Sequence, residues 1–88
     1  MMRLIKFVKS TRKNKKYDAI LEEDGKITKV SFGDSRYEHF KDRTGVGAWK
    51  HLDHNDTKRR ELFRKRHGAQ GHYKVKYSPA WFSYYYLW

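Results

Sequence analysis

Residues 17–32 read YDAILEEDGKITKVSF, two runs of strand-forming residues around a short polar centre. The centre contains Asp24-Gly25, and an Asp-Gly pair in this position favours a type I′ turn, whose two central residues both need positive φ. The second run alternates, with Thr28, Val30 and Phe32 expected on one face, as in a half-buried antiparallel strand. This stretch therefore predicts a β-hairpin.

A third strand is predicted upstream of the hairpin. Residues 4–8 (LIKFV) form a short, apolar, partly β-branched run, which is typical of strands. The polar, basic segment 10–16 separates this run from the hairpin, and Asn14 within it tolerates a left-handed turn conformation. Gly33-Asp34-Ser35 interrupts the last strand, so residues 3–32 are expected to form a three-stranded antiparallel meander.

A basic helix is predicted over residues 53–68. Asp53 is the expected N-cap, with Asp56 three residues on, so that both carboxylates lie at the positive N-terminal end of the helix. Gly68 is the expected residue just beyond the last turn. Leu62 and Phe63 form one narrow apolar stripe that is expected to pack inward, while the rest of the helix surface is cationic.

The segments that flank this helix carry weaker patterns. A short helical turn is expected near residues 37–41, and residues 69–77 are interpreted as a linker or a short strand. Gly33 permits a backbone conformation that other residues avoid, and is expected to act as the hinge between the sheet and the helices. Asp34 is expected to pair with a cation of the basic helix, such as Arg60.

The chain ends in an aromatic segment. Ser78-Pro79 is a helix-start signal, with Ser as cap and Pro at the first helical position. Trp81, Tyr84 or Tyr85, and Trp88 share one face of the helix that follows, and this face is expected to cover the sheet. The fold class is therefore α+β, a three-stranded antiparallel β-meander packed against one basic helix and a short aromatic C-terminal helix.

Composition limits the protein to a single small basic domain over residues 1–88. Lys and Arg number 21 against 10 Asp and Glu, a formal net charge of +11, and cysteine is absent. Apolar residues are 38% of the chain and aromatic residues 17%, and so high an aromatic content argues against disorder. So short a chain excludes a deep enzyme cleft. No cofactor, membrane partner or secretion is expected.

Two basic runs favour nucleic-acid binding. One lies near the N-terminus and the other on the predicted helix, and clustered cations of this kind are the electrostatic signature of phosphate binding. Binding is expected to be largely independent of sequence, non-enzymatic, and directed to DNA rather than RNA. The candidate phosphate-binding residues are Arg12, Lys13, Lys15, Lys16, Lys58, Arg59, Arg60, Arg64, Lys65 and Arg66.

The aromatic segment exceeds what one sheet can cover. Exposed aromatic patches mark protein interfaces, so the surplus predicts a contact with another protein, and base stacking is an alternative use. The candidate interface residues are Trp81, Phe82, Tyr84, Tyr85, Tyr86 and Trp88.

Residues 51–56 (HLDHND) concentrate histidines and carboxylates. His51, Asp53 and His54 superficially resemble a metal site or a His-Asn-His nuclease element. The aspartates are already accounted for as helix caps, and no further ligands follow at the required spacing. No metal site is therefore predicted, and a metal-dependent nuclease ranks last among the functions considered.

Several short motifs in a fixed order resemble one family. They are Phe32-Gly33-Asp34, Tyr37, His51-Leu52-Asp53, Arg59-Arg60, Arg66-His67, Ser78-Pro79-Ala80-Trp81-Phe82-Ser83 and Tyr86-Leu87-Trp88. Over roughly residues 15–88 the chain resembles small, basic, uncharacterised proteins of giant nucleocytoplasmic DNA viruses and large phages. Extra residues around 45–50 set it apart from the shortest members. The resemblance implies a viral setting, inside the infected host cell or within the virion, and no particular activity.

A viral setting makes a second role possible. The protein would then be a minor virion structural or assembly protein, bridging larger proteins through its aromatic segment and basic face. Deletion of residues 84–88 separates the two roles, because a core segment is needed for folding and an interface segment is not.

Overall fold

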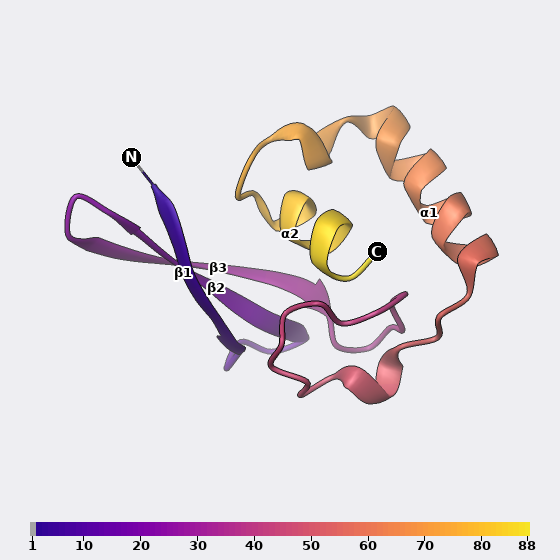
Figure 1. The fold of residues 1–88 in the computed structure, drawn as a ribbon, viewed down its shortest axis with the longest axis horizontal. Coiled ribbons are helices and arrows are strands. Elements are labelled where there is room, and N and C mark those ends of the chain that lie inside the picture. The colour runs from indigo at the N-terminus through magenta and orange to yellow at the C-terminus, as the bar shows by residue number, and fades with distance from the viewer. Residues whose placement is uncertain (1) are drawn as a thin grey trace.

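The computed structural model describes residues 2–88, except the side chain of His72. The first third is an antiparallel sheet of three strands in the order β1 (Arg3–Lys9), β2 (Lys15–Glu23) and β3 (Lys26–Asp34). Figure 1 shows this sheet as one twisted layer, with the helices at one end. The predicted meander is confirmed.

The two turns of the meander have the predicted backbone conformations. Asp24 and Gly25 have φ of 51° and 79°, the two positive values that a type I′ turn requires. Asn14 has φ of 63° in the turn between β1 and β2. Register follows from these turns, so Tyr17 pairs with Phe32 and Ala19 with Val30 across β2 and β3.

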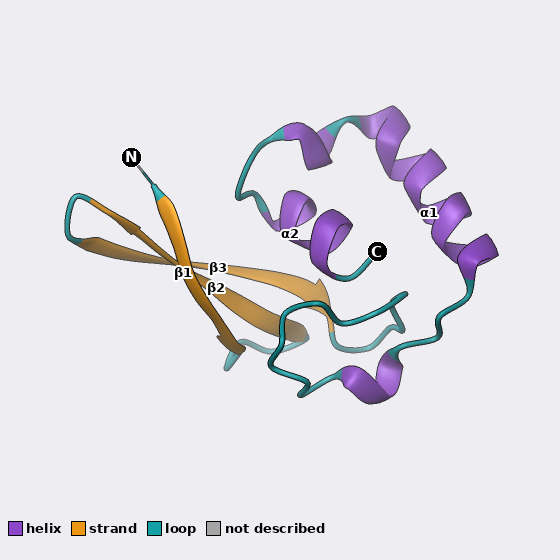
Figure 2. Cartoon of the chain, in the orientation of Figure 1, coloured by secondary structure: helices purple, strands orange, loops and turns teal. Residues whose placement is uncertain are grey.

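Four helical segments follow the sheet (Figure 2). They are the 3₁₀ helix η1 (Lys50–Leu52), α1 (Thr57–Gln70), the 3₁₀ helix η2 (His72–Lys74) and α2 (Pro79–Tyr86). The chain from α1 folds back through η2, so that α2 lies between the sheet and α1 (Figure 1). The α+β class is confirmed.

The core lies between the sheet and α2. Phe82 and Leu87 are buried against Phe32 and Tyr17, and the Phe82 and Phe32 rings stack with centroids 5.2 Å apart. The predicted face of Trp81, Tyr84 or Tyr85, and Trp88 is correct only in part, because Trp81 and Trp88 pack against the core while Tyr85 is exposed. Because α2 lies between two layers, Phe82 faces the sheet while Tyr84 and Trp88 contact α1.

The N-terminal cap of α1 is Asp56 rather than Asp53. The Asp56 carboxylate accepts hydrogen bonds from the backbone N–H groups of Lys58 and Arg59. Asp53 cannot cap the helix because its carboxylate already accepts hydrogen bonds from His39 and from the Asp42 backbone N–H. Ser78, by contrast, caps α2 as predicted, accepting from the Trp81 N–H, with Pro79 next to it.

Two further expectations about the second half were wrong. The C-cap of α1 is Gly71, with φ of 75°, and Gly68 lies inside the helix. Residues 37–41 form no helical turn, because His39 pairs with Asp53 in an isolated β-bridge. Of the two alternatives for residues 69–77, the strand is wrong, and the segment links α1 to α2 through η2. Within the described part of the chain, no helix has the length and apolar character needed to cross a membrane.

Candidate nucleic-acid interface

Most of the acidic side chains have partners within the molecule, some of them buried and some at the surface. Seven carboxylates in the described part of the chain have hydrogen-bond or ion-pair partners: Asp18, Glu22, Asp34, Glu38, Asp42, Asp53 and Asp56. Four of these, Asp18, Asp42, Asp53 and Asp56, bond to neutral partners such as hydroxyl or backbone groups, or to a histidine. None of these four forms an ion pair with a lysine or arginine in the described residues, although Asp42 and Asp53 attract the buried Lys16.

The basic side chains are mostly left without acidic partners. Within the described residues, three arginines form ion pairs, at N–O distances of 2.9 Å (Arg3–Glu22), 2.8 Å (Arg36–Asp34) and 3.1 Å (Arg59–Glu38). All three pairs are solvent-exposed on the arginine side, where ion pairs are weak. The formal charge of +11 is therefore carried largely by unneutralised groups.

The first basic run forms the turn between β1 and β2. Backbone hydrogen bonds close this turn, from Ser10 N–H to the Lys16 carbonyl at 3.1 Å and from Lys15 N–H to the Arg12 carbonyl at 3.3 Å. Arg12 and Lys13 are exposed, and Lys15 is half-buried. Three of the four predicted cations of this run therefore reach the surface.

Lys16 is the exception, and its assignment as a phosphate-binding residue was wrong. The side chain is only 2% exposed, and its Nζ lies 2.7 Å from Nδ1 of His39. Lys16 lies in the central strand β2, where residues 16–21 are all buried, and its side chain reaches His39 in the loop that follows β3. Burial lowers the pKa of Lys16 to about 8, despite the opposing attraction of Asp34, Asp53 and Asp42.

The cations of α1 divide into two groups. Lys58, Lys65 and Arg66 are exposed, and Arg59 is exposed and paired with Glu38. These four side chains extend into solvent.

The second group, Arg60 and Arg64, faces inward. Both Nε atoms donate to the Trp88 backbone oxygen, at 2.6 Å and 3.3 Å. Their guanidinium groups also lie over aromatic rings, Arg60 4.8 Å from the Phe40 centroid and Arg64 4.5 Å from the Tyr84 centroid. We conclude that Arg60 and Arg64 fasten α1 to the end of the chain. The expected pair between Asp34 and Arg60 is absent from the described residues, because Asp34 binds Arg36, two residues away.

The two basic runs lie toward the same end of the sheet. Figure 1 shows the β1–β2 turn and α1 on either side of the loop that follows β3, away from the β2–β3 hairpin. Glu23 and Asp24 lie at the tip of that hairpin. The structure therefore separates the acidic tip from the two cationic segments, although it does not join the two runs in direct contact.

A groove lies between the sheet end, α1 and α2, with a volume of about 410 Å³. Lys15 lies at the sheet side of it, and Phe63 and His67 of α1 form the opposite wall. Its lining also includes aromatic side chains from η2, α2 and the C-terminus, namely Tyr73, Tyr84 and Trp88. Lys15 of the first basic run therefore faces the same groove as Phe63, which is next to Arg64 of the second run.

The predicted inward stripe of α1 is only half correct. Phe63 stacks on Trp88 with centroids 4.1 Å apart and an interplanar angle of 6°. Leu62, by contrast, is 58% exposed, because α1 contacts the rest of the molecule along one narrow side. The sequence pattern cannot distinguish these adjacent positions.

The candidate interface residues of the aromatic segment are mostly covered. Phe82 is fully buried, and Trp81, Tyr84, Tyr86 and Trp88 are half-buried. Tyr85, at 44% exposed, is the one member of the six that is classed as exposed. The segment is therefore chiefly part of the core, as its position between two layers requires.

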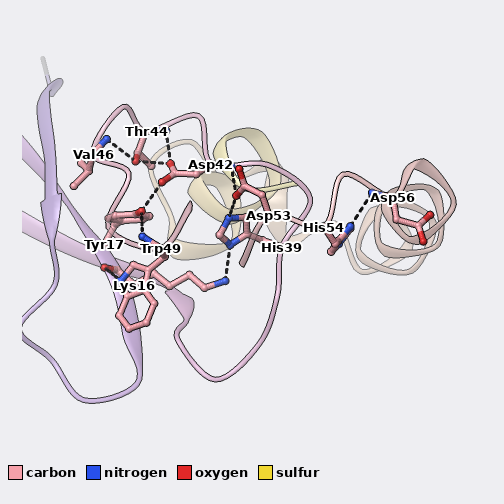
Figure 3. A network of polar contacts seen from close by, with 10 residues as sticks. All are labelled: Lys16, Tyr17, His39, Asp42, Thr44, Val46, Trp49, Asp53, His54 and Asp56. Carbon is pink, nitrogen blue, oxygen red and sulfur yellow. Dashed lines mark hydrogen bonds and ion pairs between the residues drawn. The ribbon is translucent and has the colours of Figure 1, made fainter. Parts of the chain in front are cut away.

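A buried polar network was missed by sequence reasoning (Figure 3). Lys16 donates to Nδ1 of His39, and Nε2 of His39 contacts the Asp53 carboxylate. Tyr17 donates to the Asp42 carboxylate and accepts from the Trp49 backbone N–H at 2.8 Å. The network fixes the loop between β3 and α1 to β2.

Burial and hydrogen bonding shift the pKa values of His39, Tyr17 and Asp42. Burial lowers the pKa of His39, and the neighbouring Lys16 charge lowers it further, against the attraction of Asp53. Burial and the hydrogen bond to Asp42 raise the pKa of Tyr17 to about 12. Burial alone would raise the pKa of Asp42, but hydrogen bonds from Thr44 and Tyr17 outweigh it and lower that pKa.

The residues considered for a metal or nuclease site do not converge. Asp53 belongs to the buried network, His51 lies against Trp49, and Nδ1 of His54 accepts from the Asp56 N–H at 2.9 Å. Among the side chains that the structure describes, no group of three or more His, Cys, Asp or Glu could hold a metal ion.

Comparison with known proteins gives one partial match. Residues 5–43 match the model of a family of unknown function, DUF5754. The matched part covers most of the sheet and the first residues of the following loop, and it includes Lys16, His39 and Asp42 of the buried network. No curated protein and no solved structure matches the chain.

Proposed function

We propose that this protein binds nucleic acid through phosphate contacts, largely without reading sequence and without catalysing a reaction. The observation that carries the proposal is the separation of charge within the fold. Carboxylates are engaged in internal contacts, while most lysines and arginines have no acidic partner in the described residues. Phosphates relieve the repulsion between such cations and release counterions.

The contacts come from the exposed members of both basic runs. Arg12, Lys13 and Lys15 supply the turn, and Lys58, Arg59, Lys65 and Arg66 supply the helix. Lys16, Arg60 and Arg64 hold the fold together instead. Long, exposed cationic side chains reach phosphate oxygens without contacting base edges, so they position a protein on a strand without selecting a sequence. The favoured ligand class is DNA in a viral setting.

The test compares two charge-matched double variants. Arg12→Gln/Lys13→Gln removes two cations from the β1–β2 turn, and Lys26→Gln/Lys29→Gln removes two exposed cations from β3. Fluorescence anisotropy with labelled oligonucleotides is expected to show a larger loss of affinity for the turn variant. Equal losses would mean that net charge alone attracts the ligand, and no binding by the unmodified protein would refute the proposal.

One observation favours a second role, that of a bridging protein in a virion. Lys58, Leu62 and Lys65 lie on one exposed side of α1 by helical spacing, and Leu62 is 58% exposed. An apolar side chain between cations suits an acidic protein partner. Deleting residues 84–88 tests this role, since a folded product that no longer assembles would support it. We expect an unfolded product, because Leu87 is 1% exposed.

A further inference from the structure

The groove between the sheet end, α1 and α2 has the size and lining of a ligand site. Its volume is about 410 Å³, within the range of small-molecule pockets, which are mostly apolar with a few polar groups. Three separate parts of the chain form its walls, so its shape depends on the complete fold. It is large enough for a nucleobase.

Two pairs of stacked rings form the apolar wall. Tyr73 and Tyr84 stack with centroids 4.2 Å apart, and Phe63 and Trp88 stack at 4.1 Å. Arg64 lies against Tyr84 and also donates to the Trp88 oxygen, so one guanidinium joins both pairs. The wall is therefore held in place before any ligand arrives, which reduces the entropy cost of binding.

Cations border the same groove. Lys15 lines it on the sheet side. On α1, Arg59 and Arg66 are one turn from both Phe63 and the exposed Leu62, so helical geometry places them between the groove side and the solvent side of the helix. Lys58 and Lys65 lie farther from the groove. A strand whose base enters the groove thus has cations near its phosphates.

The acidic side chains at the groove do not oppose a phosphate strongly. Asp34 and Glu38 both line it, but Asp34 is held by two hydrogen bonds from the Arg36 side chain. Glu38 is paired with Arg59 at 3.1 Å. Each carboxylate is accompanied by an arginine, so their net charge at the rim is small.

We propose that the groove receives an unpaired nucleobase, so that single-stranded nucleic acid binds more tightly than duplex. The inference rests on the proposed function and adds the class of ligand. Aromatic walls with cations at the rim are the combination that single-strand sites use, because every base has a π face and every nucleotide a phosphate. In a duplex the bases are paired and stacked, and one must be flipped out before it can enter.

The test separates bases from phosphates. The probes are a labelled oligothymidylate, an abasic phosphate chain of the same length and the corresponding duplex. Stacking of one base is expected to strengthen binding of the oligothymidylate about tenfold over the abasic chain, with duplex binding weaker than the single strand. Equal affinity for oligothymidylate and the abasic chain would overturn the inference while leaving phosphate binding intact.

Two variants that add the same side chain localise the effect. Ala80 lines the groove, so Ala80→Phe is expected to fill it and to reduce the preference for base-bearing strands to about onefold. Ala69 is exposed on α1 and outside the groove lining, and Ala69→Phe is expected to keep the preference. Circular dichroism confirms folding of each variant. If both variants lose the preference for base-bearing strands, or if neither does, the assignment of the groove as the base site is contradicted. If Ala80→Phe fails to fold, the comparison of ligands on the unmodified protein still tests the proposal.

Discussion

Nζ of Lys16 lies 2.7 Å from Nδ1 of His39, and both side chains are buried. The lysine has only donors, so Nδ1 accepts and the proton of neutral His39 is on Nε2, which faces the Asp53 carboxylate. A second proton on His39 would place two positive charges in contact. The pair therefore connects β2 to the loop before α1 and makes the stability of this connection depend on pH.

The first prediction concerns Lys16 in mildly alkaline solution. Its pKa is about 8 in the folded protein, against an ordinary value of 10.5 for a lysine in water. Between these two values the unfolded chain binds more protons than the folded one, so the free energy of unfolding rises with pH. Urea denaturation from pH 8 to pH 10 is expected to show this rise, and Lys16→Met is expected to flatten it.

The rise in the free energy of unfolding is expected to end near pH 10, because the titration of Tyr17 has the opposite effect above that pH. Tyr17 has a pKa of about 12 when folded and 10.0 otherwise, so above pH 10 the folded state binds more protons and stability falls with pH. A rise of equal size in the Lys16→Met variant would contradict the assignment, since it would place the titrating group elsewhere.

The second prediction concerns the contact between Gly33 and Leu87. Gly33 has φ of 75°, and an added Cβ would lie 2.9 Å from Cδ1 of Leu87. Gly47 has nearly the same φ, 77°, with no atom within 4 Å of an added Cβ. Gly47→Ala is expected to cost about 1–2 kcal/mol for the left-handed conformation alone, and Gly33→Ala clearly more.

Thermal or urea denaturation of these two glycine variants checks the contact. An excess loss at Gly33 measures the close approach of β3 to the C-terminal residues, because the backbone conformation is matched. Equal losses would mean that the C-terminal segment does not pack against this position.

The third prediction separates core from surface within α2. Phe82 is fully buried and its ring contacts Phe7, Phe32 and Tyr77. Phe82→Ala is expected to lower the free energy of unfolding by about 3–5 kcal/mol, as large-to-small changes in a core do. Tyr85→Ala, at an exposed position three residues on, is expected to cost much less. A similar cost at both positions would exclude the described orientation of α2.

The fold was predictable where local chemistry determines the structure. The Asp24-Gly25 turn and the Ser78-Pro79 helix start depend on neighbours in sequence, and both were confirmed. The expected alternation of β3 was wrong, because residues 26–29 are all exposed while Ser31 and Phe32 are both buried. The N-cap of α1 was not predicted correctly, because Asp53 and Asp56 are both suitable caps and lie three residues apart. Which of them caps the helix depends on His39, which lies fourteen residues before Asp53 and binds its carboxylate.

The candidate site was predictable only in part, for a related reason. A sequence shows that ten cations cluster, but it does not show which of them the fold uses. Lys16 belongs to a basic run and yet is buried against His39, and Arg60 and Arg64 bind the Trp88 oxygen. Residues that bind each other across 24 or more positions leave no recognisable pattern in the sequence. The same holds for the buried network around Tyr17 and Asp42.

The fourth prediction separates these structural cations from surface ones. Arg60→Gln removes the 2.6 Å hydrogen bond to Trp88 and the contact with Phe40, so it is expected to destabilise the protein by about 1–3 kcal/mol, the range for hydrogen bonds to charged groups. Lys65→Gln is expected to change stability by no more than about 0.5 kcal/mol and to weaken nucleic-acid binding. Denaturation and fluorescence anisotropy on both variants test this assignment. A larger loss of stability in Lys65→Gln than in Arg60→Gln would contradict it.

The central claim is that unneutralised cations on this fold bind phosphates, and the salt dependence of affinity tests it most directly. The measurement is the dissociation constant for one single-stranded oligonucleotide over a series of salt concentrations. Each phosphate contact contributes a slope of about −0.7 to the logarithm of the association constant against the logarithm of salt for single strands. The account predicts a linear plot with a slope steeper than about −2, and an affinity that does not change with salt would contradict it.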